Sequence, residues 1–199
     1  VDTTRLVLGR PGEFFRGMPV TGGLGAPLLY GVLVGWLGLV VASLYQAIFR
    51  SIVGTSLGAL GERPELAALL GWVESWAGFV AQVVFGWVFV AIGIFVTAAI
   101  LHVMLLLLGG VGNGFEATFR VVCFAQATSL VLVVPFCGQI VHPVWTLVLA
   151  VIGLAAAQRI GHGKAAAAVL LPVLLFCCCC VGAALLFAGA LASLASQMR

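Results

Sequence analysis

Five charged or titratable side chains in two short segments have the types and spacing to bind an anionic group or a partner protein. Glu116 and Arg120 are four residues apart, which places both side chains on one face of a helix. Arg159, His162 and Lys164 follow close together in a later polar segment. On the same side of a membrane, these five form a charged patch for a lipid headgroup or a partner protein, or a gating ion pair. The competing interpretation is a positively charged membrane anchor with one ordinary helix-surface pair.

Polar residues inside apolar segments are a second set of candidates, because such groups either line a path for ions or form hydrogen bonds between helices. They are His102, Gln126, His142 and Gln158. None is a carboxylate, so a proton or cation relay has no obvious carrier. Interhelical hydrogen bonding is the favoured interpretation, with His102 and Gln126 as the first candidates for a functional role.

Two unusual runs do not predict cofactor chemistry. Cys177 to Cys180 encircle a helix, because successive positions turn by about 100°, so four thiolates cannot converge on one metal. The glycine-rich run from Gly109 to Gly114 has neither the preceding strand nor the lysine of a phosphate-binding loop, and we expect a flexible hinge. Serine, histidine and carboxylate never form a credible catalytic set. We therefore predict no enzyme, no cofactor and no metal site.

The composition shows what kind of molecule must position these residues. Of 199 residues, 63% are hydrophobic and 8% charged, against about a quarter charged in soluble domains. Mean hydropathy is +1.27 and net charge only +3. These values exclude a soluble enzyme, a secreted disulfide scaffold and a nucleic-acid binder. They predict an integral membrane protein with several spans.

Long intervals without charge locate the spans, because a spanning helix needs roughly 20 apolar residues. One interval contains Pro135 and Gly138 near its middle, which favours a hairpin rather than one long helix. We predict an all-α transmembrane bundle of five helices, with the third and fourth forming a short hairpin broken by proline and glycine. Four spans remain the alternative if the hairpin re-enters without crossing. The predicted spans are residues 27–49, 77–108, 121–136, 140–158 and 165–194.

Basic residues set the orientation. With the N-terminus inside, six Lys or Arg residues fall on the inner side and three on the outer side, which favours a cytosolic N-terminus. We expect residues 1–23 to form a cytosolic interfacial segment, with Phe14 and Phe15 in the headgroups, and residues 24–199 to form the transmembrane domain. Residues 64–75 are predicted to lie along the outer surface. Because the chain begins with valine, we expect native sequence upstream.

Small residues recur along three predicted spans. Gly31 and Gly35 form one pair, and two further pairs repeat at seven residues: Gly86 with Gly93, and Gly182 with Gly189. Such stripes permit close helix contact. We expect them mainly to pack the monomer, with a homo-oligomer as the alternative.

Several motifs resemble bacterial members of the Yip1 domain family, from about Pro11 to Pro172. The centre, Gly114 to Ala125, carries the strongest similarity, and the N-terminal part contributes Pro11 to Arg16 and Gly22 to Tyr30. Further matching positions, which we expect to be structural, are Pro135, Gly138, Trp145, Gly153 and Pro172. The resemblance implies five transmembrane helices with a cytosolic N-terminus. Eukaryotic relatives act in vesicle trafficking with Rab-type GTPases, a role we do not carry over because the composition looks bacterial.

The expected function is a non-enzymatic membrane protein of the bacterial inner membrane. It would organise the membrane or bind partners through its cytosolic face. Its expected partners are the bilayer, anionic headgroups or other membrane proteins, and no nucleic acid. The alternative is a small transporter or lipid-handling protein, with a cavity between the broken third and fourth spans and the first two.

Overall fold

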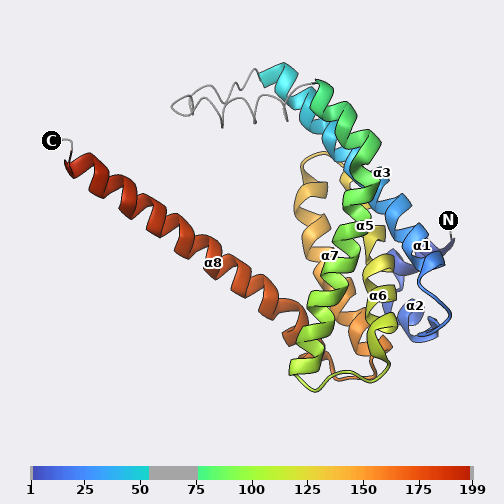
Figure 1. The fold of residues 1–199 in the computed structure, drawn as a ribbon. Helices are drawn as coiled ribbons and strands as arrows, with labels where there is room; N and C mark the ends of the chain where they lie inside the picture. The colour runs from blue at the N-terminus through green and yellow to red at the C-terminus, as the bar shows by residue number, and fades with distance from the viewer. Residues whose placement is uncertain (1, 54–75, 198–199) are drawn as a thin grey trace.

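The computed structural model describes residues 2–53 and 76–197, and every regular element in these two ranges is helical. Two short helices, α1 (Asp2–Gly9) and α2 (Pro11–Gly17), precede the long helix α3 (Gly25–Val53). The second range begins with α5 (Trp76–Leu107) and α6 (Gly114–Ala125), and α6 continues into the 3₁₀ helix η2 (Gln126–Val133). It ends with α7 (Cys137–Ala157) and α8 (His162–Gln197) (Figure 1).

Five helical segments are long and apolar enough to cross a membrane, which confirms the predicted all-α bundle with five spans. They are Gly25–Ile48, Ala77–Leu107, Gly114–Val133, Cys137–Ala157 and His162–Leu186. The third segment begins at residue 114 rather than at 121 because Glu116 and Arg120 are accommodated inside the helix. The predicted outer interfacial segment, residues 64–75, lies outside the described residues.

The third and fourth spans form a hairpin that reverses at the proline and glycine positions. Pro135 lies in the turn, and Phe136 adopts a left-handed φ of 61°. Gly138 stands against the carbonyl oxygen of Val131, and a Cβ there would also lie 3.0 Å from Leu132 Cα. Any larger residue would push the two arms apart. The hairpin is shorter than α3 and α5, which continue side by side beyond its tip (Figure 1).

Glycines on α3 bring this helix into backbone contact with the third span. A Cβ at Gly31 would lie 3.0 Å from Cys123 Cα, and one at Gly38 would lie 2.7 Å from the carbonyl oxygen of Ser129. Gly86 on α5 faces Leu39 and Trp36 of α3. The contacts of Gly31, Gly35 and Gly86 therefore lie within the chain, whereas Gly93 and Gly182 have no atom within 4 Å of an added Cβ.

The N-terminal residues 2–24, here called the N-terminal layer, pack on the bundle. Val7, Phe15 and Met18 belong to the buried core, and the Phe15 side chain is only 1% exposed. Its ring fits over Gly153 of α7, where an added Cβ would lie 3.2 Å away. The expected insertion of Phe15 into the headgroups is thus wrong, because α7 offers a glycine-sized recess inside the protein. Phe14 is half-buried and stacks edge-on against Phe124 of α6.

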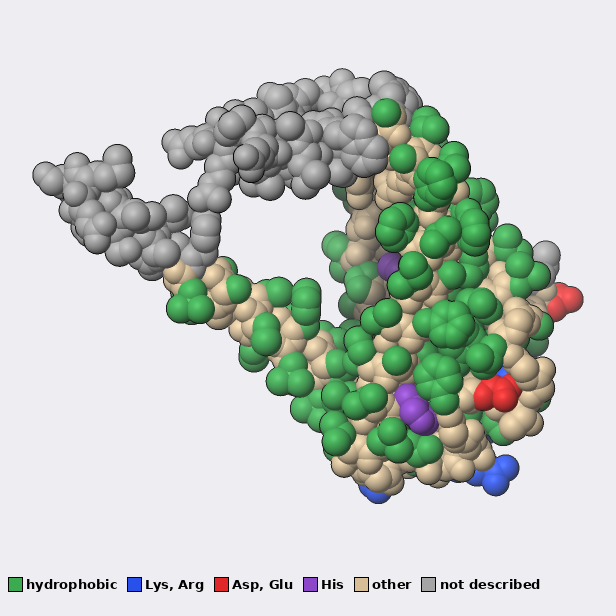
Figure 2. All heavy atoms as spheres, viewed as in Figure 1, with side chains coloured by type: hydrophobic (Ala, Val, Ile, Leu, Met, Phe, Trp, Pro, Cys, Tyr) green, Lys and Arg blue, Asp and Glu red, His purple; other side chains and the backbone are tan. Residues whose placement is uncertain are grey.

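Helix α8 joins the bundle only near its start. Ala165, Ala168 and Val169 are buried, and beyond them the helix diverges from the other spans (Figure 1). Pro172 lies inside this helix, and Cys177 to Cys180 are exposed. Hydrophobic side chains cover α5 and the described part of α8 in Figure 2. Exposed apolar surface of this extent requires lipid around it.

The close contact between α3 and η2 makes a testable prediction. We expect Gly38→Ala to destabilise the protein by about 1–3 kcal/mol, because the added methyl group overlaps Ser129. Gly93→Ala is the matched control, since nothing lies near its Cβ position. Unfolding titrations in mixed detergent micelles measure both variants. Equal stability of the two would contradict the packing described.

Candidate functional site

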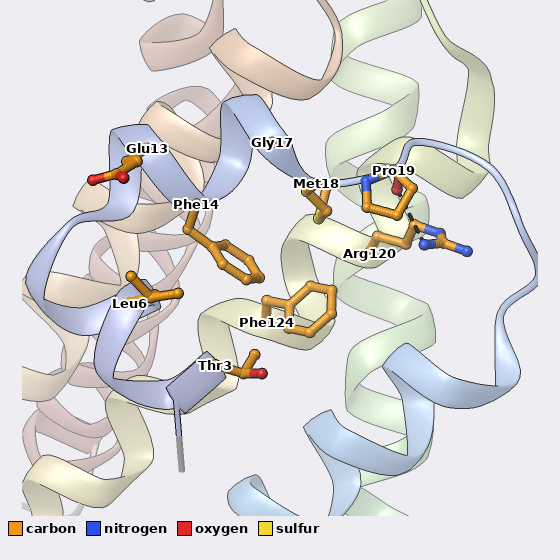
Figure 3. Close-up of a pocket in the computed structure, with 9 residues that line it drawn as sticks. All are labelled: Thr3, Leu6, Glu13, Phe14, Gly17, Met18, Pro19, Arg120 and Phe124. Atoms are coloured by element: carbon orange, nitrogen blue, oxygen red, sulfur yellow. Dashed lines mark hydrogen bonds between the residues drawn. The ribbon is translucent and has the colours of Figure 1, made fainter.

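Arg120 lies on α6 with its side chain only 7% exposed, and it reaches the chain that leads into α3. Its Nη1 donates to the carbonyl oxygen of Pro19 at 3.0 Å, and its Nη2 donates to that of Gly23 at 2.8 Å. Figure 3 shows the bond to Pro19. A buried guanidinium needs such acceptors, because burying an unpaired charge costs several kcal/mol.

Glu116, one turn earlier, completes this arrangement. Its Oε1 lies 3.2 Å from Arg120 Nε and 3.1 Å from Nη2, and it also accepts the backbone N–H of Gly23 at 2.7 Å. We call Glu116, Arg120 and the backbone of Pro19 and Gly23 the arginine clamp. It fastens the N-terminal layer to α6.

Glycines 22 and 23 allow the chain to enter the clamp. Their φ angles are 122° and 93°, in the left-handed region that side chains rarely adopt. A Cβ at Gly22 would also lie 3.1 Å from Arg120 Nη2. The two glycines therefore permit a turn in which the N–H and the carbonyl group of Gly23 face Glu116 and Arg120.

The other predicted charged residues do not join the clamp. Arg159, His162 and Lys164 are exposed: Arg159 lies in the connection after α7 with a left-handed φ of 55°, and His162 and Lys164 lie in the first turn of α8. No hydrogen bond or ion pair among the described residues links them to Glu116 or Arg120. The structure thus joins two of the five candidates and leaves three at the surface.

Gln158 forms a second connection, between the end of α7 and the start of α6. Its side chain is 1% exposed, and Oε1 accepts the backbone N–H groups of Gly112 and Asn113 at 2.9 and 2.8 Å. Nε2 donates to the carbonyl oxygen of Gly114 at 2.8 Å and to Thr118 Oγ1 at 2.9 Å. Hydrogen bonds therefore join the glycine-rich loop to the end of α7, and the expected hinge flexibility stays a prediction.

His102 and Gln126 also face neighbouring elements. His102 Nδ1 lies 3.3 Å from Thr118 Oγ1, so α5 contacts the residue that Gln158 binds. Gln126 Oε1 accepts from Ser129 Oγ at 3.4 Å and lies 3.2 Å from the Cβ position of Gly35. Trp145 packs against the core from α7. These contacts are those of interhelical packing and hydrogen bonding.

A pocket of about 390 Å³ lies between the N-terminal layer and α6 (Figure 3). Leu6, Phe14, Met18 and Phe124 provide apolar walls, and the clamp residue Arg120 closes one side. Sequence reasoning missed this pocket, because its walls come from segments about a hundred residues apart. The adjacent residues Phe14 and Phe15 were the available signal in the sequence for an apolar contact in this segment. In the described part of the chain, no three His, Cys, Asp or Glu side chains are placed to hold a metal ion.

Five apolar spans and a membrane-facing apolar surface define an integral membrane protein of the polytopic helical class. Within this class, the chain belongs to the Yip1 family, since the Yip1 domain model matches residues 5–194. The match includes most of the N-terminal layer, the arginine clamp and the hairpin. No curated protein and no solved structure gave a significant match to the chain.

The Gln158 contacts predict a large loss of stability on substitution. Gln158→Leu removes the partner of two backbone N–H groups and a carbonyl oxygen at a partly buried site, so we expect a loss of about 1–3 kcal/mol in total. Gln139→Leu, at an exposed position of the same helix, should change the free energy of unfolding by less than about 0.5 kcal/mol. Unfolding titrations test both, and similar values for the two variants would refute the assigned role.

The arginine clamp predicts graded release of the N-terminal layer. In Arg120→Gln, the shorter neutral side chain cannot reach both carbonyl groups, so amide hydrogen exchange in residues 18–24 should rise by about tenfold or more. Glu116→Gln keeps an amide oxygen that accepts the Gly23 N–H, so its increase should be smaller. Arg159→Gln is the exposed control and should leave exchange in this segment unchanged. An Arg120→Gln protein with wild-type exchange would show that the clamp does not hold the layer.

Proposed function

We propose that this Yip1 family protein is a non-enzymatic scaffold that organises the membrane, or binds partner proteins or lipid headgroups, through its cytosolic face. One observation carries the proposal: the arginine clamp holds a folded layer of two helices against the charged end of the bundle. A partly buried ion pair that positions a surface segment supports a role for that surface. The Yip1 family is not known for enzymatic activity.

The distribution of charged residues also supports a binding role for the end of the molecule that carries the N-terminal layer. The proposed inner side carries six basic and three acidic residues, so it holds the whole net charge of +3. In a bacterial inner membrane with the N-terminus in the cytosol, this surface faces anionic headgroups. Arg5, Arg16, Arg159 and Lys164 are exposed there.

A transport function receives less support from the packing. The alternative requires a cavity between the broken spans and the first two, but Gly35 and Gly38 of α3 lie against Gln126 and Ser129. The contact between α3 and η2 is therefore closed. The pockets in the described part of the chain lie elsewhere: one of about 390 Å³ beneath the N-terminal layer, one of about 450 Å³ along α1, and one of about 720 Å³ between α3 and α5.

Site-specific photo-crosslinking in native membranes tests the scaffold proposal. A photoreactive phenylalanine analogue replaces the exposed Glu13 in the N-terminal layer, and the control position is the exposed Leu44 on α3. We expect a discrete protein or lipid adduct from position 13 that falls several-fold when Arg120→Gln is added and is unchanged by Arg159→Gln. Identical adducts from positions 13 and 44, or no effect of Arg120→Gln, would overturn the proposal.

A further inference from the structure

Two hollows of different chemistry adjoin each other on the N-terminal layer, and Leu6 lines both of them. The first is the apolar pocket between the layer and α6, with a volume of about 390 Å³. The second, of about 450 Å³, is lined on α1 and its end by Asp2, Arg5, Gly9 and Arg10. An apolar recess beside a basic recess matches the two halves of an amphiphile.

The apolar pocket has the properties of a site for a hydrocarbon chain. Phe14 and Phe124 meet at a ring distance of 5.0 Å and an angle of 71°, and both line the pocket. Met18, which is buried, supplies another wall, and a flexible thioether side chain adapts to different occupants. Leu6 is 41% exposed, so the pocket is open where the two hollows meet.

The basic hollow has the donors for a phosphate group. Arg5 and Arg10 lie in its wall, and the acidic side chain in the same wall is Asp2. Arg10 pairs with Glu13 at 3.6 Å, but both side chains are largely exposed, and exposed pairs of this kind are weak. Arg10 can therefore exchange Glu13 for a phosphate. Arg120 does not line this hollow, and its Nε, Nη1 and Nη2 atoms already donate within the clamp.

We propose that these two hollows together bind one anionic phospholipid of the inner leaflet, with an acyl chain between Phe14 and Phe124 and the phosphate at Arg5 and Arg10. The inference rests on the proposed function, since it names the lipid that the cytosolic face holds. Charge complementarity favours this occupant, because the surrounding end of the protein carries the net positive charge and anionic headgroups lie at that depth. Sequestering the chain between aromatic rings also fixes the N-terminal layer on the membrane surface.

Photolabelling of the full chain in lipid nanodiscs tests the proposal. The bilayer is phosphatidylcholine, doped with a trace of phosphatidylglycerol that carries a diazirine near the middle of one acyl chain, or with the matching phosphatidylcholine probe. We expect the phosphatidylglycerol probe to label residues 2–18 and 117–125 about fivefold more than the phosphatidylcholine probe does. Equal labelling by the two probes would overturn the assigned headgroup chemistry.

Matched variants separate the two halves of the site. Leu6→Trp fills the junction of the hollows and should lower this labelling about fivefold, whereas Leu44→Trp, at a similarly exposed position on α3, should leave it unchanged. Arg5→Gln combined with Arg10→Gln should abolish the preference for phosphatidylglycerol, and Arg159→Gln should preserve it. Thermal unfolding of each variant in detergent confirms that the fold is intact.

The outcomes distinguish this inference from the proposed function. Labelling that is indifferent to Leu6→Trp would overturn the lipid site. If crosslinks from position 13 still depended on Arg120, the scaffold would stand without this lipid. If position 13 instead captured a peptide that competes with the probe, the pocket would belong to a protein partner and the lipid assignment would be wrong. If lipid labelling were retained but the crosslinks from position 13 did not depend on Arg120, the scaffold proposal would be overturned and the lipid site would stand.

Discussion

A guanidinium group withdrawn from water requires acceptors around it, and this requirement shapes the end of the protein at which the N-terminal layer packs. Arg120 finds them in one carboxylate and two backbone carbonyl groups from the chain before α3. The first span therefore begins at a fixed place relative to the third, and the N-terminal layer is held where Phe15 meets Gly153. The same layer forms the outer wall of the apolar pocket. The start of α3 and the outer wall of the pocket therefore both depend on the ion pair and hydrogen bonds of Arg120.

Packing inside the bundle depends on residues that contribute little volume. Water provides no driving force between helices in lipid, so association relies on close contact and on hydrogen bonds. Gly31 and Gly38 supply the contact between α3 and the third span, and Gln158 supplies the bonds between α6 and α7. Polar residues at these places hold helices together, which is why a lone glutamine in an apolar span need not mark a transport path.

Sequence alone predicted the spans well and the site only in part, for a physical reason. Charge is excluded from the bilayer, so the charge-free intervals located the spans, and Pro135 with Gly138 divided one interval into the third and fourth spans. The pairing of Glu116 with Arg120 followed from helix geometry. Their backbone partners could not be predicted, because carbonyl groups carry no sequence signal and lie about a hundred residues earlier. Phe15 was misplaced because an aromatic residue fits headgroups and a glycine recess equally well.

The 3₁₀ segment η2 bears on how this protein matches the thickness of its membrane. A 3₁₀ helix rises about 2.0 Å per residue against 1.5 Å in an α-helix, so η2 lengthens the third span by about 4 Å, enough to cross a hydrocarbon core of about 30 Å. Helix α5, with 32 residues, is about 48 Å long. The hydrophobic length of the protein that faces the bilayer is therefore smaller at the hairpin than at α3 and α5. Hydrophobic mismatch of this kind is accommodated by helix tilt or by local changes in bilayer thickness.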